Sequence, residues 1–257
     1  MKEREFIMAL WRLFLATLQF LTRIPVRERW CDGIGLKEYA RGIVCFPLVG
    51  LVIGLLTALV WLFLLPHVGA LPAAIAVVIV HIMLTGGLHL DGLADSCDGL
   101  FSVRSRERIL EIMRDSRIGT YGALALIVAV LLRTALIYQL SADGLPVLTC
   151  LILTPVVGRG MMAVMMYRQA YARESGMGNL FIGKISEGHF YITLLLMAFL
   201  TLIVGGFTTL PALLITLTGV LGLRYFIARR IGGQTGDTLG AACELSELLF
   251  LFFLLWH

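Results

Sequence analysis

Long apolar stretches recur along this chain, and they leave few folds open to it. Seven of them approach or reach the length of a membrane-spanning helix, which needs roughly 20 mostly apolar residues: 42–65, 71–90, 118–140, 144–167, 190–206, 209–228 and 238–256. Only 15% of the residues are charged, so a soluble domain of this length would lack polar surface. The sequence therefore predicts an all-α, polytopic integral membrane helix bundle. We expect a single domain over residues 1–257 with about seven transmembrane helices.

The N-terminal segment 6–22 is apolar, but it is interrupted by Arg12 and Gln19 and ends at Arg23 and Pro25. One interpretation is a further membrane span. The interpretation favoured here is an interfacial or partly inserted helix, because such helices combine an apolar face with polar residues.

Positive charges distinguish the two sides of the predicted bundle. Lys and Arg residues gather in four long loops, at about 23–41, 91–117, 168–189 and 229–237. The intervening turns, near 66–70, 141–143 and 207–208, contain neither residue type. Cytoplasmic loops carry the excess of Lys and Arg, so the N-terminus and the long loops should be cytoplasmic and the C-terminus periplasmic. We expect the lipid bilayer to surround the predicted spans, and the charge pattern does not indicate a nucleic-acid partner.

The second apolar stretch runs into an acidic segment, HLDGLADSCDGL at 89–100. Its aspartates, Asp91, Asp95 and Asp98, stand at i, i+4 and i+7, which places them on one face of a helix. Like charges at this spacing repel each other, and a bound divalent cation removes that cost. Carboxylate oxygens are the ligands that Mg²⁺ prefers, so this face is a candidate metal site. The alternative is a solvated, charged helix end.

Two arginines flank an aspartate at the start of the third stretch, in MRDSRIGTYG at 113–122. Arg114 and Arg117 are of the type that makes bidentate phosphate contacts. Ser116 or Asp115 is the expected N-cap of the following helix, whose N–H groups would then be free for an anion. The alternative interpretation is that these arginines only anchor the membrane edge.

Four charged residues fall inside predicted spans: Arg133, Arg159, Glu244 and Glu247. Charges inside a membrane are costly, and they usually pair with one another or line a cavity. We expect Arg159 in the cytoplasmic half, near the acidic segment. For Arg133, an interhelical ion pair and a ligand contact are equally good interpretations.

Two glycine-bearing loops, 171–178 and 232–240, lie on the predicted cytoplasmic side. In the second, Asp237 and Thr238 are placed to cap the last helix, and its glycines suit a loop that closes around a phosphate. It is not a Walker A motif, because the lysine is missing. We expect both loops and the acidic segment to converge on one face.

These motifs, together with PVVGR at 155–159, GGQTGDTLGA at 232–241, FLTRIPV at 20–26 and FPLVGLVIG at 46–54, resemble the cobalamin synthase family. The resemblance covers nearly the whole chain. It implies an Mg²⁺-dependent phosphotransferase of the bacterial inner membrane, an adenosylcobinamide-GDP ribazoletransferase. Such an enzyme joins adenosylcobinamide-GDP to α-ribazole or its 5′-phosphate and releases GMP, late in coenzyme B12 assembly.

The resemblance also implies residue roles. Asp91, Asp95 and Asp98 would hold Mg²⁺ on the diphosphate, and Asp98 or Asp115 would accept the proton of the attacking hydroxyl. Contacts to substrate or phosphate are expected from His89, Arg114, Arg117, Arg159, Asp237 and Thr238. A second copy of the chain, or another enzyme of cobalamin assembly, is a further candidate partner.

Two other functions remain open at this point. The acidic segment is similar to the motif of CDP-alcohol phosphotransferases, although it lacks their arginine after the alanine and their longer spacing to the later aspartates. An ion-coupled transporter would instead use the four charges within the spans as its pathway.

Overall fold

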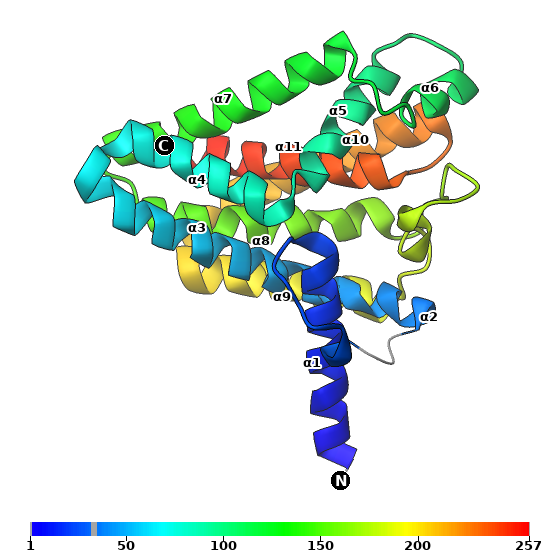
Figure 1. Ribbon diagram of the computed structural model, residues 1–257, viewed down its shortest axis with the longest axis horizontal. Helices are drawn as coiled ribbons and strands as arrows, with labels where there is room; N and C mark the ends of the chain where they lie inside the picture. Colours follow the sequence, from blue (N-terminus) through cyan, green and yellow to red (C-terminus); the bar gives the residue numbers. More distant parts are fainter. Residues whose placement is uncertain (1, 32–34, 257) are drawn as a thin grey trace.

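A computed structural model describes residues 2–31 and 35–256 (Figure 1). Residues 32–34 of the predicted loop 23–41, and the chain ends at 1 and 257, lie outside the described residues. The long helices are α1 (Lys2–Leu21), α3 (Phe46–Val68), α4 (Ala70–Thr85), α5 (Leu88–Leu100), α7 (Thr120–Ala142), α8 (Val147–Met166), α9 (Glu187–Gly205), α10 (Leu210–Ile231) and α11 (Gly236–Leu254). The short ones are α2 (Leu36–Tyr39), α6 (Arg106–Ile112) and the 3₁₀ turns η1 (Glu28–Trp30), η2 (Ala40–Cys45), η3 (Met177–Leu180) and η4 (Phe207–Thr209).

Among the described residues, five helices are long and apolar enough to cross a membrane: α3 (extended by η2), α7, α8, α9 and α10. Each coincides with a predicted span to within a few residues. Helix α8 lies at the centre of the bundle and is mostly buried, whereas α7, α9 and α10 expose much of their apolar surface. The prediction of an all-α polytopic membrane protein is confirmed.

The second predicted span, 71–90, is not one continuous helix. Helices α4 and α5 are separated by Gly86 and Gly87 and are bent by 89° relative to each other. Both glycines have positive φ, 63° and 70°, a conformation that side-chain-bearing residues rarely adopt. The pair counts as a sixth, bent span at most. We place α5 outside the membrane-spanning segments, because it carries three aspartates.

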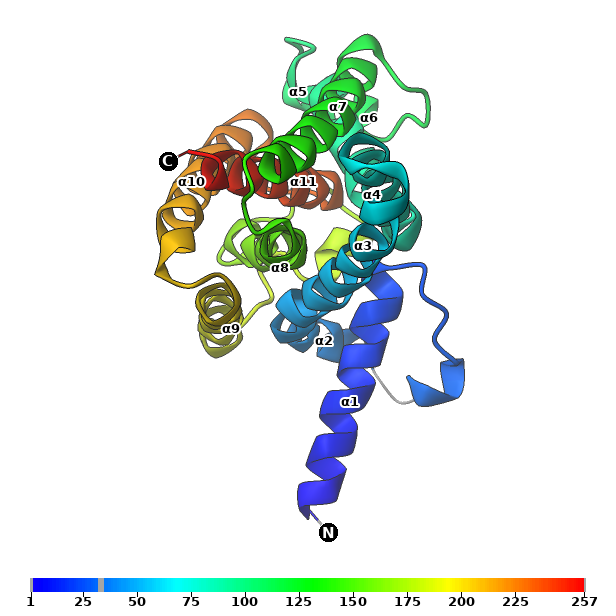
Figure 2. The ribbon, with the colours of Figure 1, turned by 90° about the vertical axis from the view of Figure 1, so that its left-hand side faces the viewer.

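The last predicted span, 238–256, coincides with α11, which is helical but too rich in charge to count among the apolar helices. It packs against α5, α7, α8 and α10 (Figure 2), so Glu244 and Glu247 face protein and are buried. In the part of the chain that the structure describes, the apolar helices therefore number five, or six with the bent pair, where the sequence predicts about seven. Helix α11 can carry charged residues because they are buried against other helices of the bundle and do not face lipid.

Helix α1 crosses the bundle at a steep angle, and its N-terminal half projects away from it (Figures 1 and 2). Its C-terminal turns are anchored by buried side chains such as Leu18 and Leu21, whereas Ile7 and Trp11 are 58% and 55% exposed. An exposed apolar helix that runs across the bundle axis suits the membrane interface. This geometry supports the interfacial interpretation over a further span.

Glycines bring α3 and α8 into backbone contact. A Cβ at Gly50 would collide with the Pro155 carbonyl, and one at Gly54 with Ile152. Small residues spaced four apart allow such close approach between membrane helices. The other helices pack around this close pair, with α11 on α8 and α4 on α3.

Candidate active site

A cavity of about 230 Å³ lies where α5, the N-terminus of α11 and the loop after α8 meet. Its polar lining comes from His89, Asp91, Tyr171, Arg173 and Asp237. Apolar side chains from α1 and α8 complete its wall. The predicted convergence of the acidic segment with the two glycine-bearing loops is confirmed.

Backbone hydrogen bonds hold the two glycine-bearing loops together. The N–H of Ala172 donates to the Gln234 carbonyl, and the N–H of Gln234 donates to the Ala170 carbonyl, each at 2.9 Å. A Cβ at Gly233 would collide with the Ala170 carbonyl, so this approach requires glycine. The paired loops present Arg173 and Asp237 to the same cavity.

The cap of α11 differs in detail from the sequence prediction. Thr235 is the N-cap, and its Oγ1 accepts the N–H of Thr238 at 3.2 Å. Thr238 completes the capping box, because its Oγ1 accepts the N–H of Thr235 at 2.9 Å. Thr238 contributes to the cap, as expected, but it is fully buried. Its predicted contact with phosphate is therefore not supported.

Arg173 is the residue of this site to which the sequence analysis assigned no role. Its Nη2 lies 2.5 Å from Oδ2 of Asp237, and the two side chains are only 11% and 21% exposed. Nη2 also donates to the Met113 carbonyl at 3.1 Å. In sequence, an arginine in a cytoplasmic loop resembles any other that follows the positive-inside rule. Only its spatial position beside Asp237 distinguishes it.

The aspartates of α5 share one helical face, as predicted, but their surroundings differ. Asp91 is exposed and lines the cavity, whereas Asp95 is half-buried. Burial raises the pKa of Asp95 to about 7, and the negative charges of Asp237 and Asp91 add to this rise. Gly92 allows the contact between α5 and α11, because a Cβ there would lie 2.7 Å from the Asp237 carbonyl oxygen. We call Asp91, Asp95 and Asp237 the acidic cluster.

Asp98 is directed to the start of α7 instead. Its Oδ2 accepts the N–H of Gly119 at 2.7 Å, and its Oδ1 accepts the N–H of Gly122 at 2.8 Å. The expectation that Ser116 or Asp115 caps this helix is wrong, since Gly119 is the N-cap. Two N–H groups predicted to be free for an anion are already satisfied. The placement of Asp98 therefore favours a structural role over the predicted metal and proton-acceptor roles.

Asp115 and Arg117 pair with each other at the surface. Arg117 Nη2 lies 2.6 Å from Oδ2 of Asp115, and the arginine side chain is 87% exposed. Hydrogen bonds from Arg117 lower the pKa of Asp115 to about 2, which makes this carboxylate a weak proton acceptor. The structure thus gives no support to a catalytic role for Asp115, and it shows Arg117 already engaged.

Arg114 is exposed and is not part of the cavity lining. Burial raises the pKa of Tyr171, and the positive charges of Arg173 and Arg114 oppose this rise. Arg114 therefore lies within electrostatic range of the cavity rim, where Tyr171 stands. Its predicted contact with phosphate is consistent with this position.

Beneath the cavity, the four charges of the predicted spans pair with one another. Arg133 lies 2.7 Å from both Glu244 and Glu247, and Arg159 forms an ion pair with Glu247. The ion-pair interpretation of Arg133 is confirmed. Arg159 is fully buried and does not line the cavity, so its predicted phosphate contact is not supported. Charges that satisfy each other also make a poor transport pathway.

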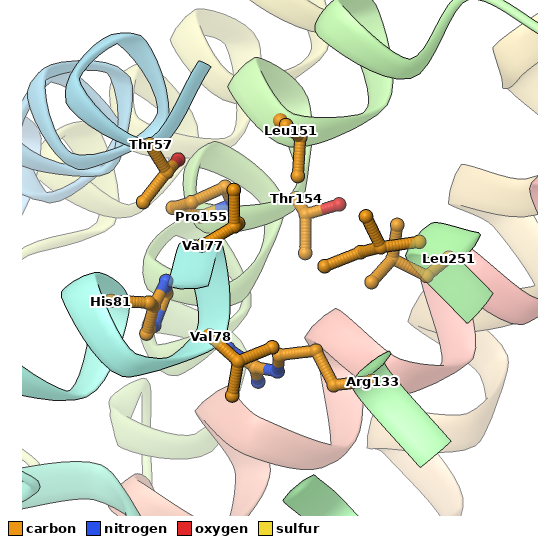
Figure 3. Close-up of a pocket in the computed structure, with 10 residues that line it drawn as sticks. Thr57, Val77, Val78, His81, Arg133, Leu151, Thr154, Pro155 and Leu251 are labelled. Atoms are coloured by element: carbon orange, nitrogen blue, oxygen red, sulfur yellow. The ribbon is translucent and has the colours of Figure 1, made fainter. Parts of the chain in front are cut away.

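Two histidines adjoin this buried network. Nδ1 of His89 lies 3.3 Å from Nη2 of Arg159, and its Nε2 is buried without a hydrogen-bond partner in the described part of the chain. Nε2 of His81 lies 3.6 Å from Glu247. Figure 3 shows His81 and Arg133 beside a small cavity of about 20 Å³, surrounded mainly by apolar side chains. Only His89 belongs both to the network and to the larger cavity.

The acidic cluster has the donor chemistry of a magnesium site, because all its ligands are carboxylate oxygens. Across residues 2–31 and 35–256, no three His, Cys, Asp or Glu side chains converge closely enough to hold a metal ion as they stand. Burial raises the pKa of Asp95 and the negative charges of Asp237 and Asp91 raise it further, and a bound cation would oppose this rise. The ligand atoms of the acidic cluster therefore suit a divalent cation in type but not in their present spacing, and Mg²⁺ stays a prediction.

Comparison with known proteins gives consistent relatives. The family model described as cobalamin-5-phosphate synthase matches residues 13–255. The chain is 49% identical over 245 residues to adenosylcobinamide-GDP ribazoletransferases of Escherichia coli O157:H7, Escherichia coli O45:K1 and Shigella dysenteriae serotype 1. These alignments cover 95% of this chain and 99% of each relative. No solved structure matches the chain. The chain therefore belongs to the cobalamin-5-phosphate synthase family.

Proposed function

We propose that this protein transfers the phosphorylated corrinoid of adenosylcobinamide-GDP to α-ribazole or α-ribazole 5′-phosphate and releases GMP. The observation that carries this proposal is the cavity in which His89, Asp91, Arg173 and Asp237 meet, in a chain of this family. The cavity combines carboxylates, which suit a cation, with an arginine, which suits a phosphate.

The reaction is a substitution at phosphorus. A ribose hydroxyl attacks the phosphorus on the corrinoid side of the diphosphate, and a new P–O bond forms. The bond from that phosphorus to the bridging oxygen breaks, and GMP leaves with this oxygen. The proton of the hydroxyl passes to a carboxylate of the acidic cluster. Such transfers depend mainly on positioning and on neutralising charge.

We assign metal binding, phosphate binding and hydrogen bonding to different residues of the site. Asp91, Asp95 and Asp237 would hold Mg²⁺, which neutralises diphosphate charge when bound. Arg173 and Arg114 contact phosphate oxygens, and the ion pair with Asp237 holds Arg173 at the cavity. His89 donates a hydrogen bond to the substrate. This assignment keeps Asp91, Asp95, Arg114 and His89 in the roles predicted from the sequence, and it changes the role of Asp237 from a substrate contact to a metal ligand.

The site faces the cytoplasm of a bacterium, and the chain resides in the inner membrane. The support is the charge pattern, because arginines cluster in the loops on the cavity side of the bundle. Assembly with a second copy or with other cobalamin enzymes stays a prediction.

The test uses purified protein in proteoliposomes with adenosylcobinamide-GDP, α-ribazole and Mg²⁺, and measures GMP release. We expect Asp91→Asn and Asp237→Asn to lower the rate by roughly 100-fold or more. Asp143→Asn, a change at an exposed aspartate outside the cavity, is the matched control. Wild-type protein that releases CMP from a CDP-alcohol, or that only conducts ions, would overturn the proposal.

A further inference from the structure

A second and more open cleft, of about 600 Å³, lies between the α4–α5 bend and α7. Two residues, Leu88 and Asp91, line both this cleft and the 230 Å³ cavity. Both spaces therefore border the first turn of α5, with Asp91 at their junction. A ligand that passes over Asp91 would reach from one space into the other.

The cavity and the cleft differ in volume, and the two ends of adenosylcobinamide-GDP, a corrin macrocycle and a nucleoside, differ in size as well. Pockets for small molecules and cofactors commonly measure about 300–1,000 Å³. The smaller cavity falls below this range, and it suits a phosphate with part of a nucleoside. A corrin macrocycle has many more heavy atoms than a nucleobase and does not fit there. The open cleft, at about 600 Å³ against about 230 Å³, offers more room.

The walls of the cleft suit a broad, partly apolar ring system with polar substituents. Leu90, Leu126 and Val130 supply an apolar surface, and the exposed Arg23 supplies a donor for amide carbonyl groups. The backbone N–H of Arg23 donates to the Leu84 carbonyl at 2.7 Å, which fixes this arginine to the end of α4. At Gly87, a Cβ would meet no atom within 4 Å, so the bend leaves open space.

We propose that this cleft binds the corrinoid of adenosylcobinamide-GDP, with the diphosphate crossing Asp91 into the smaller cavity. The inference rests on the proposed function and adds where the corrinoid, the largest part of the substrate, is bound. It places the reacting phosphorus at the junction, beside the acidic cluster and Arg173. Leu126 and Val130 lie about 9 and 15 Å along α7 from Thr120, at 1.5 Å per residue. The wall of the cleft on α7 therefore lies within the membrane-spanning segment Thr120–Ala142.

The test fills the cleft without changing the acidic cluster. Leu126→Trp and Val130→Trp each add an indole to the half-buried wall of α7. Leu131→Trp adds one to a side chain that is 64% exposed, and it is the matched control. Binding of adenosylcobinamide, which has the corrinoid but no diphosphate or guanosine, is followed by its visible absorption in equilibrium dialysis. GMP binding is measured in parallel to verify that each variant is folded.

We expect both cleft variants to weaken adenosylcobinamide binding at least tenfold and to leave GMP binding unchanged, while Leu131→Trp alters neither. Unchanged adenosylcobinamide binding in both cleft variants overturns the inference. So does loss of a co-purified phospholipid from these variants with corrinoid binding intact, because the cleft would then be a lipid site. Failure of the proposed function looks different, since wild-type protein would then neither bind adenosylcobinamide nor release GMP.

Discussion

Nη2 of Arg159 lies 3.3 Å from Nδ1 of His89, and this contact determines which edge of the imidazole is available to a ligand. A guanidinium only donates hydrogen bonds, so Nδ1 must be the acceptor. A second positive charge beside a buried guanidinium would be costly, so the ring is neutral and its proton is on Nε2. Nε2 has no partner among the described residues. His89 therefore has a buried N–H donor without a partner among the described residues, on a ring that lines the cavity.

Two substitutions at His89 test this arrangement. Glutamine places its amide nitrogen near the position of Nε2, and asparagine places it near Nδ1. A hydrogen bond to a charged group contributes about 1.5–3 kcal/mol, so His89→Asn should lower kcat/KM for GMP release roughly 10- to 100-fold. We expect His89→Gln to retain most of the wild-type value. Equal losses in both variants would contradict the Nε2 donor.

Asp98→Asn should affect stability more than chemistry. A neutral amide has one oxygen, so it cannot accept from both Gly119 and Gly122 as the carboxylate does. Loss of a helix cap costs about 0.5–2 kcal/mol, which thermal unfolding in detergent would detect. Mg²⁺ affinity should stay near that of the wild type, in contrast to Asp91→Asn. If Asp98→Asn abolishes Mg²⁺ binding with unchanged stability, Asp98 is a metal ligand.

The raised pKa of Asp95 predicts a pH dependence of stability. Its folded-state pKa is about 7 against an ordinary value of 3.8, so the folded state favours the protonated form. This contribution is fully present below about pH 4 and is lost as the pH rises through about 7. Without divalent cations, the Tm should therefore fall over this window.

The same reasoning predicts the effect of removing the charge. Asp95→Asn should reduce the fall of the Tm with rising pH. It should also raise the Tm at pH 8, by about 2–4 °C for each kcal/mol gained in the free energy of unfolding. Saturating Mg²⁺ should reduce the fall in wild-type protein, because a cation favours the ionised carboxylate. An identical pH profile in wild type and Asp95→Asn would refute this account of the acidic cluster.

The buried network predicts unequal effects of removing its two glutamates. Glu247 contacts Arg133 and Arg159, whereas Glu244 contacts Arg133, which retains Glu247 when Glu244 is replaced. Breaking a buried ion pair by removing one partner costs about 3–5 kcal/mol. Glu247→Gln should reach this range and Glu244→Gln should fall below it, as measured by chemical denaturation in detergent. Equal destabilisation would show that the network is not organised around Glu247.

The positions of the apolar helices could be predicted from sequence because length and hydropathy are local properties. The break within 71–90 could not, because apolarity says nothing about the backbone conformation of Gly86 and Gly87. The side chain of Arg23 occupies the space where a Cβ of Gly86 would lie. The bend thus depends on a contact between segments that are distant in the sequence.

For the site, the sequence motifs predicted which segments lie together. They did not predict the hydrogen-bond or ion-pair partner of each side chain. Asp91 and Asp237 reach the cavity as expected. Asp98 and Arg159 do not act as expected, because their partners, at Gly119, Gly122 and Glu247, come from other helices. A cluster of carboxylates predicts shared chemistry, whereas the three-dimensional contacts separate ligand-facing side chains from those that support the fold.

The pairing of α11 with α7 and α8 has a consequence for how the protein is made. Ribosomes deliver α7 and α8 to the membrane first, each with an arginine whose carboxylate partner has not yet been synthesised. An arginine at a helix centre costs about 2.5–3.5 kcal/mol on insertion, which the apolar residues around it offset. Translation of the final helix neutralises both arginines at once. A nascent chain that stops before Gly236 therefore retains two arginines without their carboxylate partners.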